Sequence, residues 1–276
     1  MADELERVRK ALRELGKSLR SLNGESAPKD VHKLRTASRR VEAIAGVLEA
    51  ADGKKSRRLV KSIEPLRKAA GGVRDMDVLL ADARKLARYC DGESLNHLVA
   101  HLEAARQQYA GQLQHALHHR RKAVREDLKE YSKFLASLAK HAQSRSRSDA
   151  QAGRAQEEIN SSAMNVLREL GDWKPLDAEN LHAFRLKVKQ LRYTMQLDAQ
   201  ANSGLTEALG DVQTRVGEWH DWHQLEEIAR QVLVLEEDRP LLDRIGETVK
   251  RGFDRALASA NALRGKYLNM PPAMGA

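Results

Sequence analysis

Two stretches of the chain that lie 150 residues apart share one arrangement of histidine and basic residues. At about 100° per residue, His32, Arg35 and Arg39 fall within an arc of roughly 60° on a helix. The second stretch repeats this spacing with His182, Arg185, Lys189 and Arg192. Apolar residues gather on the opposite side of each helix, at Leu34, Ala37, Val41, Ile44 and Leu48 and at Phe184, Val188, Leu191 and Met195. The pattern predicts two matching amphipathic helices from an internal duplication.

The rest of the chain also favours helices. Phe, Trp and Tyr make up only 4% of the residues and there are six prolines, whereas sheets are enriched in aromatic and β-branched residues. Apolar residues open the chain at alternating steps of three and four, at Leu5, Val8, Leu12, Leu15, Leu19 and Leu22. With 276 residues, 41% of them hydrophobic, the chain can bury a sizeable core as one large domain or two subdomains. We therefore predict an all-α fold.

Breaks in the helical spacing indicate where the elements begin and end. The second helix is predicted from about Pro28 to Ala51, with a turn at Asp52-Gly53. Pro65 is expected to kink the third helix, and the Gly71-Gly72 pair is expected to separate two helical patterns. The stretch from Ser94 to Lys140 predicts one or two long helices.

The clearest polar break separates two halves of comparable length. It runs Gln143-Ser144-Arg145-Ser146-Arg147-Ser148-Asp149 and is typical of a linker. We place a first helical repeat at 1–142, a polar linker at 143–155 and a second helical repeat at 156–265. Residues 266–276 are expected to form a disordered tail.

The charge of the chain indicates an affinity for polyanions. Its net charge is +9, but 39 acidic residues are interspersed among 48 basic ones, so any binding surface must be a concentrated patch. Arginine offers paired donors to phosphate oxygens, lysine adds a mobile point charge, and histidine can donate one hydrogen bond. The two stripes therefore predict phosphate coordination. The alternative is that their histidines only stabilise the fold while the basic residues are solvated.

Other kinds of site receive less support from the sequence. Several histidine pairs share a helix face: His97 with His101, His115 with His118 or His119, and His220 with His223. None of these pairs has an obvious third and fourth metal ligand, and the HExxH pattern is absent. No Ser-His-Asp set or GxSxG elbow is present. We therefore predict no metal site, no cofactor and no catalytic residue. Cys90 is the only cysteine and no apolar run has the length of a membrane span, which favours a cytoplasmic protein.

Three motifs together carry a resemblance to a known family. They are His32-x-x-Arg35-x-x-x-Arg39-Arg40, Gly72-Val73-Arg74-Asp75-Met76-Asp77-Val78, and Leu181-His182-x-x-Arg185-x-x-x-Lys189-x-x-Arg192-Tyr193. From about Leu5 to Leu263 the chain resembles the CHAD family, the conserved histidine α-helical domain. The resemblance implies two pseudo-symmetric helical bundles with a basic groove or pore between them. It also implies binding of inorganic polyphosphate in that groove and association with polyphosphate granules.

The resemblance assigns polyphosphate-binding residues to both repeats. In the first repeat they are His32, Arg35, Arg39 and Arg40, and in the second they are His182, Arg185, Lys189, Arg192 and Tyr193. The second repeat departs from the first at Gln190, which stands where the first has Arg40. Its glycine motif also differs, because it reads Gly217-Glu218-Trp219-His220-Asp221.

The sequence favours a non-enzymatic polyphosphate-binding module over two alternatives. A phosphoryl-transfer or phosphohydrolase enzyme acting on polyphosphate usually holds a metal with clustered carboxylates, and the basic stripes contain none. A nucleic-acid-binding helical protein is disfavoured by the low aromatic content and the lack of a known reading motif. Inorganic polyphosphate is thus the expected partner, with no membrane association.

Overall fold

The residues that the computed structural model describes are mostly helical. It describes residues 2–22, 27–47, 49–89, 92–143, 161, 163–195, 202–234 and 236–268, and these ranges contain no strand. The predicted all-α class is therefore confirmed. The chain divides into two compact units, one made of Met1–Arg84 and Val99–Asp149 and the other of Lys85–Leu98 and Ala150–Ala276. The predicted linker at 143–155 lies, from residue 144 onward, outside the described residues.

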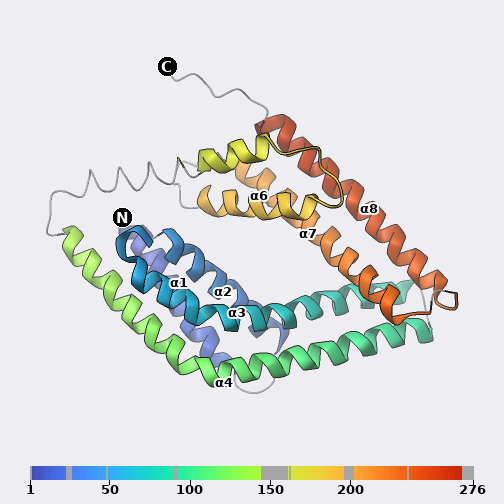
Figure 1. Cartoon of the computed structure of the whole chain (residues 1–276), viewed down its shortest axis with the longest axis horizontal. Helices are drawn as coiled ribbons and strands as arrows, with labels where there is room; N and C mark the ends of the chain where they lie inside the picture. Colours follow the sequence, from blue (N-terminus) through green and yellow to red (C-terminus); the bar gives the residue numbers. More distant parts are fainter. Residues whose placement is uncertain are drawn as a thin grey trace. The chain divides into compact units, whose positions relative to one another are not determined.

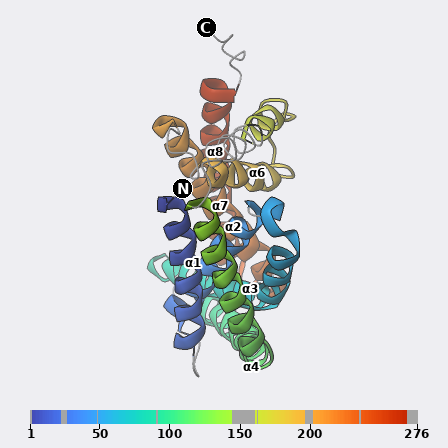
Figure 2. The same cartoon turned by 90° about the vertical axis from the view of Figure 1, so that its left-hand side faces the viewer.

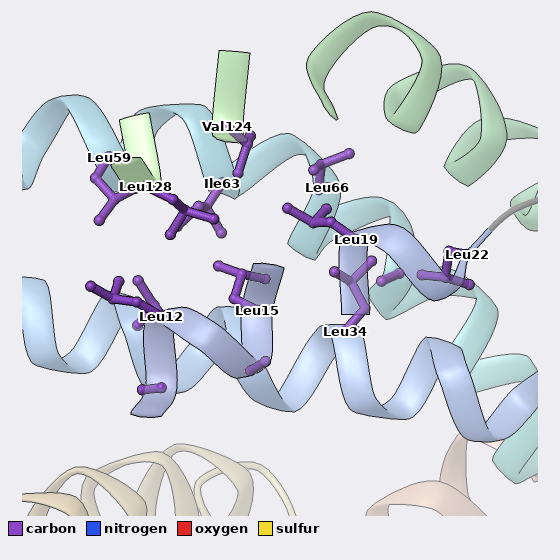
Figure 3. Packing of buried hydrophobic residues seen from close by; sticks show 14 of the residues in the cluster. Leu12, Leu15, Leu19, Leu22, Leu34, Leu59, Ile63, Leu66, Val124 and Leu128 are labelled. Atoms are coloured by element: carbon purple, nitrogen blue, oxygen red, sulfur yellow. The ribbon is translucent and has the colours of Figure 1, made fainter. Parts of the chain in front are cut away.

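The first unit is built from four helices that pack side by side (Figures 1 and 2). They are α1 (Ala2–Ser21), α2 (Pro28–Val47), α3 (Glu49–Lys85) and α4 (Glu93–Gln143). The apolar positions predicted for the first helix are buried: Leu12, Leu15, Leu19 and Leu22 point toward residues of the other three helices (Figure 3). The predicted apolar face of α2 is buried in the same core, at Leu34, Ala37, Val41 and, in part, Ile44.

α3 is one continuous helix, which corrects two sequence-based expectations, the turn at Asp52-Gly53 and the break at Gly71-Gly72. It contains Asp52-Gly53, Pro65 and the Gly71-Gly72 pair, so none of them ends or divides it. A proline inside a helix costs about 3 kcal/mol because it removes one backbone hydrogen bond. The neighbours of Pro65, Ile63 and Leu66, are fully buried, and burying each such side chain contributes about 1.5–3 kcal/mol. Tertiary packing thus outweighs the local breakers.

Polar contacts fix α3 against α4 in an antiparallel register. Ser56 shares a buried hydrogen bond with the hydroxyl of Tyr131, at 3.2 Å. Farther along α3, Asp77 is buried and accepts a hydrogen bond from Arg106 Nε at 2.6 Å. Residue numbers fall along one helix as they rise along the other, so the pair forms a long hairpin. The predicted long helix over 94–140 is confirmed as the single helix α4.

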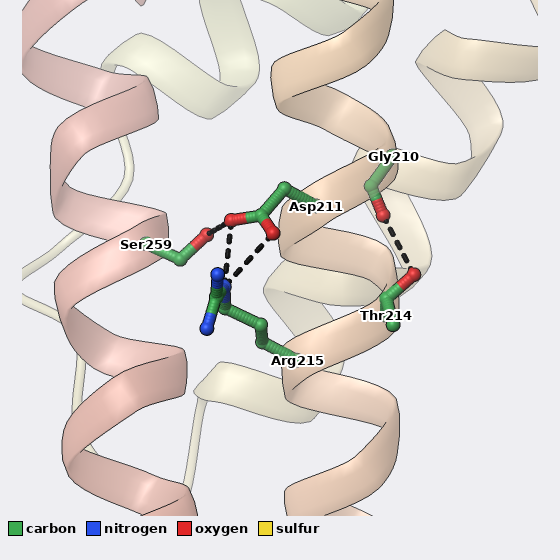
Figure 4. Close-up of polar contacts among 5 residues, drawn as sticks. All are labelled: Gly210, Asp211, Thr214, Arg215 and Ser259. Atoms are coloured by element: carbon green, nitrogen blue, oxygen red, sulfur yellow. Dashed lines mark hydrogen bonds and ion pairs between the residues drawn. The ribbon is translucent and has the colours of Figure 1, made fainter.

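The second unit contains a helix over residues 163–171, α6 (Leu181–Met195), α7 (Ser203–Val232) and α8 (Arg239–Leu263), with η2 (Arg264–Leu268) after it. Trp219 is buried and its ring lies 5.5 Å from that of Phe253, as expected for a core anchor. Asp211 of α7 accepts hydrogen bonds from Arg215 and from Ser259 of α8 (Figure 4). These bonds hold the pKa of Asp211 below its usual value. Residues 269–276 of the predicted tail lie outside the described residues.

The connection between α3 and α4 belongs to the second unit. It includes η1 (Leu86–Arg88) and the first turns of α4. The guanidinium carbon of Arg244 lies 4.1 Å from the ring centre of Tyr89. Hydrogen bonds from Ser94 and from the backbone N–H of Val234 hold the pKa of Asp238 below its usual value. The sequence-based boundaries had put residues 85–98 in the first repeat.

Replacing Gly72 by alanine should destabilise the first unit. A Cβ at this position would lie 2.5 Å from Cδ1 of Tyr109 on α4, so the ring or the helix must shift. Overpacking of this kind costs about 1–3 kcal/mol. We expect Gly72→Ala to lower the free energy of unfolding in urea.

Gly111→Ala is the matched control, because this α4 glycine has no atom within 4 Å of its added Cβ. There the better helix propensity of alanine should raise stability by about 0.5–1 kcal/mol. Equal effects of the two substitutions would contradict the close approach of α3 to Tyr109.

Candidate anion-binding site

The basic stripe of α2 faces away from the core of the first unit. Because Leu34 and Val41 are fully buried, the helix places His32 on the surface and leaves Arg35 and Arg39 partly buried. The predicted basic stripe therefore lies on the outer side of α2, opposite the apolar side chains that are buried in the core.

Arg35 is held by α3. Its Nη1 donates a hydrogen bond to Asp75 Oδ1 at 3.0 Å. Gly71 lies beside this contact, and a Cβ added there would be 4.0 Å from Arg35 Nε, an ordinary van der Waals distance. Partial burial raises the pKa of Asp75 above its usual value, while the positive charges of Arg35, Arg39 and Arg74 oppose the rise. One carboxylate thus lies among three guanidinium groups, and the cluster keeps a positive excess.

Arg40 lies apart from this cluster. Its Nη1 contacts Glu14 Oε2 of α1 at 2.6 Å. Arg40 follows Arg39 by one residue, so it points about 100° away around the helix. The structure brings Arg35 and Arg39 together near Asp75 and directs Arg40 toward α1.

In the second unit, two arginines of the α6 stripe donate hydrogen bonds to amide oxygen atoms of α7. Arg185 Nε donates to the backbone carbonyl of Gln213, and Arg192 Nη1 donates to Gln213 Oε1, both at 3.0 Å. Gly217 allows the approach of Arg185, because a Cβ there would lie 2.8 Å from Nη2. Lys189 is partly buried on the same helix. Tyr193 belongs to α6, but its side chain lies outside what the structure describes.

A stacked histidine pair completes this part of the second unit. The rings of His182 and His220 lie 4.0 Å apart at an angle of 38°. His182 Nδ1 is buried and has no hydrogen-bond partner among the described residues. Burial lowers the pKa of both histidines, and the neighbouring charge of Arg185 adds to the effect. For His220 the pKa falls from 6.5 to about 4, so both rings are neutral near pH 7.

Sequence reasoning left His220 without a role. One sequence feature could have pointed to it. His220 follows Gly217 by three residues, so both lie on the same side of α7, and Gly217 faces Arg185. Only the packing of α7 against α6 shows that this histidine meets His182.

The two hairpins, α2 with α3 and α6 with α7, repeat a local geometry within their own units. In each, an arginine three residues after the stripe histidine lies against a glycine of the following helix, Arg35 against Gly71 and Arg185 against Gly217. The correspondence supports the predicted duplication, which remains a prediction. In both hairpins guanidinium groups are held beside further cations, an arrangement suited to oxyanions.

Histidine side chains of α4 lie close to one another in two pairs. His115 and His119 have ring centres 4.3 Å apart, and His118 and His119 are 5.1 Å apart. Among the described residues, no group of three or more His, Cys, Asp or Glu side chains is placed to hold a metal ion.

Comparison with known proteins gives the family. The family model for the CHAD domain matches residues 6–230, which is most of the chain. The chain belongs to the CHAD family. Its fold is similar to the crystal structure of the CHAD domain from the plant Ricinus communis, with a TM-score of 0.67 and 18% sequence identity. The similarity covers 96% of this chain and 90% of the plant chain, so the whole CHAD fold is shared. No curated protein matches the chain.

Across the described part of this CHAD chain, no helix combines the length and the apolar character that a membrane crossing requires.

The stacked histidines give a pH-dependent prediction. In the free CHAD protein, His220 should titrate near pH 4 and His182 below 6.5. Both pKa values lie below that of an unfolded histidine, so the unfolded chain binds protons more readily. The contribution of this pair to stability should therefore be lost as pH falls from 6.5 toward 4. Ring 15N chemical shifts measured against pH would test this, and a His220 pKa at or above 6.5 would contradict the buried stack.

Proposed function

We propose that this CHAD protein binds inorganic polyphosphate through the stripes of α2 and α6. The observation that carries the proposal is the placement of Arg35 with Arg39, and of Arg185 with Lys189, on faces whose opposite sides are buried. Positive side chains held in place lose less conformational entropy on binding a phosphate chain than mobile ones do. The resemblance that identified the family also implies polyphosphate as the ligand.

The structure supports a division of roles among the nine proposed contact residues. Arg35 and Arg185 are fixed by hydrogen bonds from their guanidinium groups, and a guanidinium group has five N–H donors with which to contact phosphate oxygens. Arg39 and Lys189 supply neighbouring charge. His32 lies exposed at the start of α2, where it can donate to the same chain. The other members of the set are Arg40, His182, Arg192 and Tyr193.

We further propose that one long polyphosphate engages both stripes. After the first stripe has bound, the second contact becomes intramolecular and gains from effective concentration. Such a binder would be carried to polyphosphate granules in the cytoplasm. Neutral His182 and His220 would take up protons beside bound phosphates, so polyphosphate affinity should rise as the pH falls below 6.5.

Neutralising either stripe should weaken binding of long-chain polyphosphate about tenfold or more, since each charge-assisted contact contributes about 1.5–3 kcal/mol. The variants are Arg35→Gln/Arg39→Gln and Arg185→Gln/Lys189→Gln, alone and combined. Each contacted phosphate releases counterions, so the slope of log affinity against log salt should become shallower in each variant. The measurement is a fluorescence titration at several salt concentrations.

Lys10→Gln/Lys17→Gln is the control, because both lysines are exposed on α1 and the change in net charge is the same. Circular dichroism should show unchanged helicity in every variant. If single-stripe variants kept the wild-type slope and affinity and lost only half the stoichiometry, the stripes would be independent sites. If they matched the α1 control, the proposed site would be wrong.

Binding without turnover is the expected behaviour. We expect no phosphate release from polyphosphate in the presence of magnesium, manganese or calcium, measured over hours with purified protein. Sustained release that an Arg35→Gln or Arg185→Gln substitution abolishes would favour the alternative, a phosphohydrolase or phosphoryl-transfer enzyme. A second competing hypothesis is nucleic-acid binding. Single-stranded DNA and RNA at equal phosphate concentration should bind more weakly than polyphosphate.

A further inference from the structure

A basic pocket lies on α4, and its described lining includes no residue of either stripe. Its volume is about 720 Å³, within the range of small-molecule sites. Leu22, just after α1, and Leu117 of α4 line it and are almost fully buried, so its floor is the edge of the core of the first unit. Its described lining residues all belong to the first unit.

Cationic side chains dominate the wall of this pocket. Arg121, Lys122, Arg125 and Lys129 line it, and Glu126 is the one acidic residue among the described residues that do. They recur at steps of three and four along α4, so they share one face over about 12 Å of helix. His118 extends the same face by one turn. The lining carries a net charge of +3 when His118 is neutral.

The partners of these cations differ from those of other basic residues in the unit. Arg121 is anchored, because its Nη2 donates to the backbone carbonyl of Leu22. No ion pair joins Lys122 or Arg125 to any residue that the structure describes. By contrast, Arg58 pairs with Asp127 and Lys133 pairs with Glu130 on the same helix. Like charges three or four residues apart destabilise a helix, so an anion bound here would relieve their repulsion.

We propose that the α4 pocket is a second anion-binding site, which takes a short run of condensed phosphates. Four permanent cations along about 12 Å exceed what one carboxylate can neutralise, whereas linked phosphates carry repeated charge at a matching scale. No Phe, Tyr or Trp is among the described residues that line the pocket, which disfavours a stacked nucleobase. The site does not depend on the proposed role of the stripes.

Tripolyphosphate is the probe that tests this site. We would titrate it calorimetrically into the protein with both stripes neutralised, Arg35→Gln/Arg39→Gln/Arg185→Gln/Lys189→Gln. One tripolyphosphate should still bind, and adding Lys122→Gln/Arg125→Gln should weaken it about tenfold. In the wild-type protein, Lys122→Gln/Arg125→Gln alone should weaken one tripolyphosphate site about tenfold and leave the others unchanged, so the test holds even if the fourfold variant fails to fold.

The control is Lys54→Gln/Lys61→Gln, which removes two exposed lysines of α3 in the same unit and leaves the pocket intact. The proposal is overturned if pocket and control variants bind tripolyphosphate equally well, or if neutralising the stripes of a folded protein abolishes its binding. A different result would separate the two proposals. If the stripe variants keep their affinity for long-chain polyphosphate while Lys122→Gln/Arg125→Gln abolishes it, the proposed function of the stripes is wrong and the anion site in the pocket is supported.

The phosphates could come from a free short chain or from a segment of a long one, and two results separate these sources. If a segment of a long chain occupies the pocket, Lys122→Gln/Arg125→Gln should also weaken long-chain binding and make its salt dependence shallower. If the pocket takes a separate short anion, long-chain affinity should stay within twofold of wild type while the tripolyphosphate site disappears. Either result supports an anion site in the pocket.

Discussion

The burial of one apolar stripe on each basic helix decides where the charges of this protein lie. Leu34 and Val41 of α2 are fully buried, and so are Phe184 and Val188 of α6. Each contributes about 1.5–3 kcal/mol by leaving water. Turning either helix by half a turn would expose these side chains and bury arginine, at several kcal/mol for each unpaired charge. The orientation of each basic face therefore follows from the core beneath it.

The following helix then holds the arginine of each stripe. In the second unit, Gly217 lets the guanidinium group of Arg185 lie where a side chain would otherwise stand, whereas a Cβ at Gly71 would only come into ordinary contact with Arg35. The acceptors differ between the units, since Arg35 meets the carboxylate of Asp75 and Arg185 meets the carbonyl of Gln213. A carbonyl orients a guanidinium without cancelling its charge, whereas a carboxylate does both. The two units thus hold the corresponding arginine with different kinds of acceptor.

The sequence predicted features that depend on residues near one another in the chain. Helical spacing was sufficient for the all-α class and the buried face of α2. It was wrong about the turn at Asp52-Gly53 and the break at Gly71-Gly72, because the continuity of α3 depends on packing against α1, α2 and α4. The His182–His220 stack lay beyond its reach for the same reason. Such contacts join residues far apart in sequence, and local periodicity carries no information about them.

The two stripes respond to acid by different chemistry but in the same direction. Partial burial raises the pKa of Asp75, so as pH falls this carboxylate loses its negative charge early and Arg35 no longer faces a counterion. On α6 the positive charge grows instead, because His182 and then His220 take up protons. Both changes make the surface more positive, and a bound polyanion would promote both by the same linkage. In the proposed binding mode, the negative charge of the phosphate chain would therefore favour protonation of Asp75, His182 and His220 and so increase the positive charge of both stripes.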